Sequence, residues 1–130
     1  MKKLTLPSGR ILEVGLSPWE TGENLYQTIA GELLKMVSSA HQELDESFIL
    51  KIGLLVVSSK EVKRDIWACT PKCLIDGERL TRDHFEDEAH RDDYLLAMKE
   101  IAMVNIMPFM KSLYAQYAPI LEMLKKSALA

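Results

Sequence analysis

The chain has 130 residues, of which 48% are hydrophobic and 27% are charged. This composition excludes a disordered chain and fits one compact domain, residues 1–130, with a buried core. The 19 acidic and 16 basic residues give a net charge of −3. A nucleic-acid-binding protein usually carries a surplus of basic residues, so we expect no nucleic-acid partner.

The N-terminal segment MKKLTLPSGRIL begins with two lysines, as a signal peptide does, but a proline, a glycine and an arginine interrupt its apolar stretch. The longest apolar stretch, Ile52 to Val57, is far shorter than the roughly 20 residues that span a membrane. We therefore expect a cytosolic protein without a membrane partner, in which Cys69 and Cys73 are reduced thiols.

Residues 3–14 alternate between apolar and polar side chains on either side of a Pro7-Ser8-Gly9 turn. Glycine readily adopts the positive φ that such turns need. The pattern predicts a β-hairpin over residues 3–14. A lone hairpin is only marginally stable in water, so this one must pack against other elements.

A helix start follows at Ser17-Pro18-Trp19-Glu20. Serine can cap the helix, proline suits its first position, and glutamate completes a capping box. The helix is expected to reach about Ser39, because apolar residues recur at helical spacings: Trp19, Tyr26, Ile29, Leu33, Met36 and Val37.

The segment 45–57 fits either a helix or a buried strand, because its run ILKIGLLVV is continuously apolar. We favour a helix, since Asp45 can cap it and no turn signal closes a strand pair. A second capping box at Ser58-Ser59-Lys60-Glu61 predicts a short helix that ends before Thr70-Pro71.

Residues 73–80 contain Asp76-Gly77, a dipeptide typical of a tight turn between extended strands. A long helix is expected from near Glu88, with a kink or a break at Pro108. A last helix then carries an apolar row of Phe109, Leu113, Tyr117, Ile120 and Leu124. The whole pattern predicts a mainly α fold, a compact bundle of about five helices with a short N-terminal β-hairpin.

The spacing of Cys69, Cys73, His84 and His90 resembles that of a zinc-binding set. Thr70-Pro71-Lys72 makes a poor zinc knuckle, however, and the histidines lie among acidic residues. A zinc-binding helical module is therefore the least favoured alternative, and two buried thiols with two surface histidines is the preferred interpretation.

No serine stands in a nucleophile elbow and no glycine-rich loop could hold a phosphate. The acidic run near residue 90 lacks the glycine and the spacing of a calcium loop, and negative charge suits a helix start. We therefore expect no enzymatic activity and no cofactor.

Five of the seven methionines fall in the C-terminal third, at positions 98, 103, 107, 110 and 123. A single methionine most often fills a core, but a cluster is also typical of surfaces that fit more than one partner. Ile106, Met107, Met110 and Leu113 are therefore candidates to cover a partner or a second copy of the chain.

Two stretches together carry a family resemblance: LTLPSGRILEVGLSPWETGENLYQTIAGEL and CLIDGERLTRDHFEDEAHRDDYLLAMKEIAMVNIMPFMKSLYAQY. In this order they resemble the tail assembly chaperones of long-tailed bacteriophages, especially lambdoid siphophages. The resemblance spans most of the chain, although residues 40 to 70 match only in helical character.

The resemblance implies a non-enzymatic, mainly helical protein of the host cell cytoplasm that is absent from the mature virion. Such chaperones keep the tape measure protein soluble and help tail tube subunits assemble around it. Many are made in two lengths by a programmed ribosomal frameshift, and this chain is similar to the short form. The longer form is thought to recruit the tail tube protein, and the family tends to self-associate.

The matching residues imply two structural motifs. Phe85, Arg91, Asp93 and Tyr94 resemble an aromatic plug with an ion-paired helix start. Asn105, Pro108 and Phe109 resemble the joint between the last helices.

A helical client needs an apolar groove. The predicted surface for partner binding or self-association therefore comprises Ile106, Met107, Phe109, Met110, Leu113 and Tyr117.

Besides the zinc module, two alternatives remain outside this family. Another small phage morphogenesis or head–tail adaptor protein would share the size and the helical character but stay in the virion. A helix-turn-helix regulator would need a basic recognition helix, whereas the late helices carry only four lysines, at positions 99, 111, 125 and 126.

Overall fold

The computed structural model describes the backbone of residues 1–36 and 46–129, and their side chains except those of 34–36, 46–49, 114, 116–118 and 120–129. The described part is mainly helical, as predicted. Its four helices are α1 (Trp19–Met36), α2 (Glu46–Ser58), α3 (Lys60–Trp67) and α4 (Asp92–Leu129). Its strands are β1 (Lys2–Thr5), β2 (Ile11–Val14), β3 (Cys73–Ile75) and β4 (Glu78–Arg79). Three short 3-10 turns cover Thr70–Lys72, Arg82–Phe85 and Glu88–His90.

The N-terminal hairpin is confirmed, but it forms only half of a four-stranded antiparallel sheet in the order β1-β2-β3-β4. The second hairpin pairs with the first, so that Leu12 lies opposite Ile75 and Val14 opposite Cys73. All four of these side chains are buried. The sheet therefore supplies one apolar wall of the core, and its hairpins stabilise each other.

The Asp76-Gly77 dipeptide forms the tight turn predicted for it. Both residues have positive φ, 49° and 82°, which is the conformation that two-residue hairpin turns require. The Asp76 carboxylate also accepts a hydrogen bond from the Ile11 amide at 2.8 Å. The turn thus binds the first hairpin as well as closing the second.

Helix α1 begins where it was predicted, but the expected cap is wrong. In a capping box the Ser17 amide would donate to the Glu20 side chain, but here it donates to the Asn105 side-chain oxygen at 2.9 Å. The Ser17 hydroxyl donates to the Cys69 carbonyl oxygen at 3.2 Å, which satisfies a buried acceptor. The predicted end of the helix, near Ser39, lies outside the described residues.

Segment 46–58 is a helix, α2, as favoured from the sequence, while its proposed cap Asp45 lies outside the described residues. The short helix that follows, α3, is confirmed, but its cap lies one residue later than the predicted box: the Ser59 hydroxyl accepts the Val62 amide at 3.2 Å, while the Ser58 hydroxyl donates to the Leu54 carbonyl oxygen. Ser59 is therefore the single residue between helices α2 and α3.

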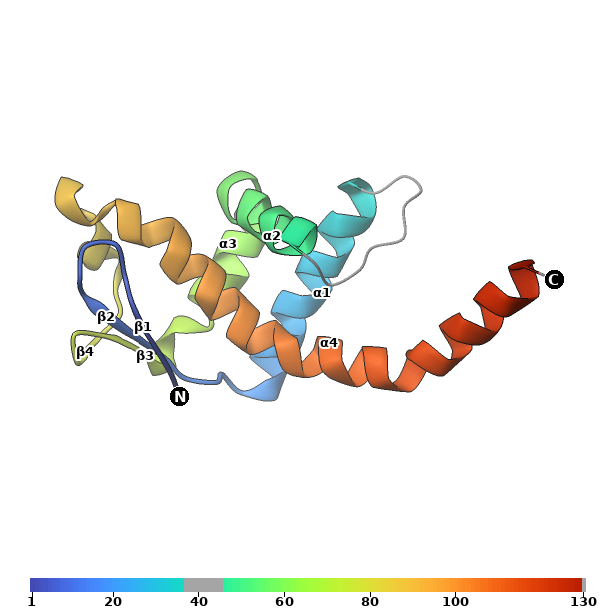
Figure 1. Ribbon diagram of the computed structural model, residues 1–130. Coiled ribbons are helices and arrows are strands. Elements are labelled where there is room, and N and C mark those ends of the chain that lie inside the picture. The colour runs from blue at the N-terminus through green and yellow to red at the C-terminus, as the bar shows by residue number, and fades with distance from the viewer. Residues whose placement is uncertain (37–45, 130) are drawn as a thin grey trace.

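The prediction of about five helices is wrong in number. The described part has four, because Pro108 does not divide the C-terminal helical segment into two helices. Helix α4 runs unbroken from Asp92 to Leu129 with Pro108 and Pro119 inside it. A proline removes one backbone hydrogen bond, which a helix can accommodate by bending. Figure 1 shows that the axis of α4 bends in the C-terminal half of the helix.

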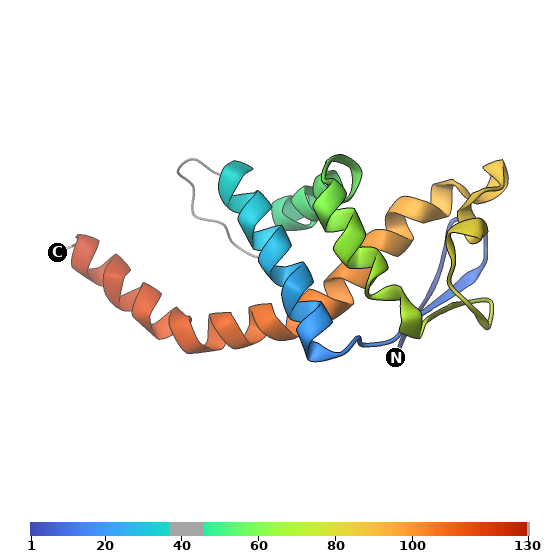
Figure 2. The same cartoon turned by 180° about the vertical axis from the view of Figure 1, so that it is seen from behind.

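The N-terminal half of α4 is the centre of the fold. It contacts α1, α2, α3 and the sheet strand β2. The C-terminal half extends away from these elements, as both Figure 1 and Figure 2 show.

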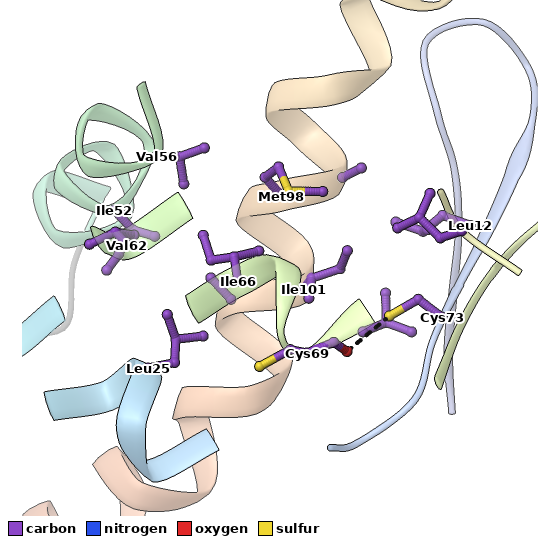
Figure 3. Packing of buried hydrophobic residues seen from close by; sticks show 14 of the residues in the cluster. Leu12, Leu25, Ile52, Val56, Val62, Ile66, Cys69, Cys73, Met98 and Ile101 are labelled. Carbon is purple, nitrogen blue, oxygen red and sulfur yellow. Dashed lines mark hydrogen bonds between the residues drawn. The ribbon is translucent and has the colours of Figure 1, made fainter. Parts of the chain in front are cut away.

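Side chains from every layer meet on α4 (Figure 3). Met98 and Ile101 of α4 lie between Leu12 of the sheet on one side and Val56 of α2 on the other, and all four are fully buried. Leu25 of α1 and Ile66 of α3 complete the centre of the cluster.

Truncation of this centre should destabilise the whole fold. We expect Ile101→Ala to lower the free energy of unfolding by about 3 kcal/mol, because it removes buried methyl groups and leaves a cavity. Leu95→Ala on the exposed side of the same helix is the matched control and should cost much less. Urea denaturation followed by circular dichroism measures both, and equal losses would contradict this core.

Candidate interaction surface

The start of α4 is tied to the N-terminal turn by a buried carboxylate. Asp93 is fully buried and accepts hydrogen bonds from the Ser8 amide at 2.9 Å and from the Ser8 hydroxyl. The Arg10 guanidinium donates to the same carboxylate through Nε at 3.0 Å and through Nη2 at 2.8 Å. The buried charge is therefore paired and its oxygens are saturated with donors.

These contacts change the acidity of Asp93. Burial alone would raise the pKa of this carboxyl, but the Ser8 hydrogen bonds and the Arg10 charge outweigh burial and hold the pKa below its ordinary value of 3.8. Asp93 is thus ionised at neutral pH, and its charge stabilises the folded state.

An aromatic cluster lies beside this ion pair and contains the predicted plug. Phe85 is buried and meets Tyr94 edge-on at 5.3 Å and Trp67 at 6.3 Å between ring centroids. The Arg10 guanidinium carbon lies 5.9 Å from the Phe85 centroid. Arg10 therefore links the carboxylate to the aromatic rings.

The ion-paired helix start uses a different arginine from the one predicted. Arg91 is exposed and donates only to the Glu86 carbonyl oxygen, at 3.4 Å. Arg10 lies in the N-terminal hairpin, far from Asp93 in sequence, so local patterns gave no reason to select it.

Asn105 forms the second buried polar link. Its side-chain oxygen accepts the Ser17 amide at 2.9 Å, and its side-chain nitrogen donates to the Ile101 carbonyl oxygen at 2.8 Å. Asn105 thereby holds the segment that leads into α1 against the middle of α4.

The next turn of α4 packs directly on α1. Phe109 stacks on Tyr26 with ring centroids 5.9 Å apart, and a Cβ on Gly22 would lie 3.2 Å from both the Asn105 carbonyl oxygen and the Phe109 ring. The close approach of the two helices therefore depends on a glycine. Pro108 is exposed on the outside of this joint.

The predicted partner surface divides into three parts. Ile106 is fully buried, so it belongs to the core and offers no surface to a partner. Met107, Phe109 and Met110 are half-buried, and Leu113 is 47% exposed. The backbone of Tyr117 lies in α4, but its side chain is outside the described part.

The sequence analysis did not predict a second apolar surface. It is a cleft of about 430 Å³ between α2 and the first two turns of α4, lined by Leu50, Gly53, Leu54, Val57, Asp92, Leu95, Leu96 and Lys99. The signal was present in the continuous apolar run of α2, because a helix with that sequence has apolar side chains on all sides.

A smaller hollow of about 100 Å³ lies where α1 begins. Trp19 and Leu16 are exposed beside it, and Pro108 and Phe109 form its other wall. Trp19 belongs to the apolar row predicted for this helix, but it is 71% exposed and lies on this surface.

The four residues of the zinc-like spacing do not come together in a metal-binding cluster. Among the residues whose side chains are described, no three His, Cys, Asp or Glu residues lie close enough to hold a metal ion. Burial raises the pKa of Cys69, and it raises that of Cys73 to about 11, so both are protonated thiols. The Nε2 atom of His84 instead lies 3.6 Å from the Oε2 atom of Glu78.

Within the described ranges 1–36 and 46–129, no helix is both long and apolar enough to span a membrane. Comparison of the chain with protein-family models, curated proteins and solved structures finds no significant match.

Removal of the Asp93 charge should destabilise the protein and change its response to acid. We expect Asp93→Asn to cost about 3 kcal/mol at pH 7, because it leaves Arg10 without its buried partner. Since the folded-state pKa is lowered, this stabilisation is fully present above pH 3.8 and is lost as pH falls through the folded-state value.

The difference in free energy of unfolding between Asp93→Asn and the wild type should therefore become smaller in strong acid. Urea denaturation at several pH values measures it, with Asp92→Asn, at the exposed neighbour, as the control. An Asp93→Asn variant as stable as the wild type at pH 7 would contradict the role of this carboxylate.

Proposed function

We propose that this chain is a non-enzymatic tail assembly chaperone of a long-tailed bacteriophage. It keeps the tape measure protein soluble and helps tail tube subunits assemble around it in the host cytoplasm, and it is absent from the mature virion. Two motif stretches that follow each other in the order of the family support this function. A mainly helical fold is also what the resemblance implies.

The proposal rests above all on the C-terminal half of α4, which extends away from the other elements of the fold. Its sequence repeats apolar residues at intervals of three and four: Met110, Leu113, Tyr117, Ile120 and Leu124. Leu113 is 47% exposed, and this half of the helix extends away from the rest of the fold (Figures 1 and 2). An apolar helical row of this kind suits contact with another helix, in a client or in a second copy.

Methionines suit a client whose sequence varies along its length. Met107 and Met110 are half-buried next to Leu113. Their flexible side chains can adapt to different partner surfaces at low energetic cost. The tail tube protein is a second partner in this proposal, recruited through a frameshift-extended form of the chain.

Reading the DNA of the gene tests the proposed short form. A slippery run of adenines near Lys125-Lys126, followed by an open reading frame in the −1 phase, is the expected result. A clean stop without an overlapping frame would favour another phage morphogenesis or head–tail adaptor protein. That alternative predicts that mass spectrometry finds the chain in purified particles.

A single charge placed in the apolar row should disrupt client binding. We expect Leu113→Asp to reduce the tape measure protein that co-purifies with the chain at least about tenfold, because it puts a carboxylate into an apolar contact. The far-UV helix signal should not change, since Leu113 is exposed.

Lys111→Gln is the matched control for this variant. It changes the net charge by the same amount at an exposed position on the same turn of α4. If Leu113→Asp retains as much client as Lys111→Gln, the apolar row is not the contact surface.

A further inference from the structure

We draw no further inference here: the strongest candidate, the apolar cleft between α2 and the first two turns of α4, carries nothing further because nothing in the described part of the chain shows whether a partner helix, a second copy or another segment covers it.

Discussion

The buried carboxylate of Asp93 is the constraint on which the rest of the structure depends. An ionised group without water needs several donors, and here they all come from the turn of the N-terminal hairpin. The sheet is thereby held at the first turn of α4. Asn105 follows 12 residues later on the same helix, about 18 Å along its axis, and holds the entry to α1. These two links position the sheet and α1 along one helix and let the apolar core close between them.

This arrangement leaves two apolar surfaces uncovered on α4. The C-terminal half of α4 carries the exposed Leu113. The first two turns of α4 carry the exposed Leu95, which lines the cleft together with apolar side chains of α2. The buried polar links lie on the sides of α4 that face the hairpin and α1, so they do not compete for either surface. The anchored core and the apolar contact surfaces are thus separate in the molecule. The proposed chaperone function would use this separation, because the core could stay intact while the outer surfaces meet different clients.

Local features of this fold could be predicted from the sequence, while those set by distant residues could not. The turn at Asp76-Gly77 and the start of α3 depend on a few neighbouring residues; the turn is confirmed, and the helix is capped within one residue of the predicted position. Ser17 has equally good capping chemistry, but the side chain of Asn105, 88 residues away, accepts the amide hydrogen that the capping box needs. Pro108 would end an isolated helix, whereas tertiary packing on α1 continues α4 through it. In the predicted contact surface, Leu113 is exposed and Ile106 is buried, because helical spacing alone does not say which apolar side faces the core.

The most direct test of the proposed function is the solubility of the tape measure protein from the same genome, expressed with and without this chain. The family resemblance implies a client that is long, helical and prone to aggregate on its own, so its soluble fraction measures the proposed chaperone activity without a catalytic readout. We predict that it is largely insoluble alone and that co-expression brings most of it into the soluble fraction as a complex with this chain. An unchanged soluble fraction, with this chain well expressed and folded, would contradict the tail assembly chaperone.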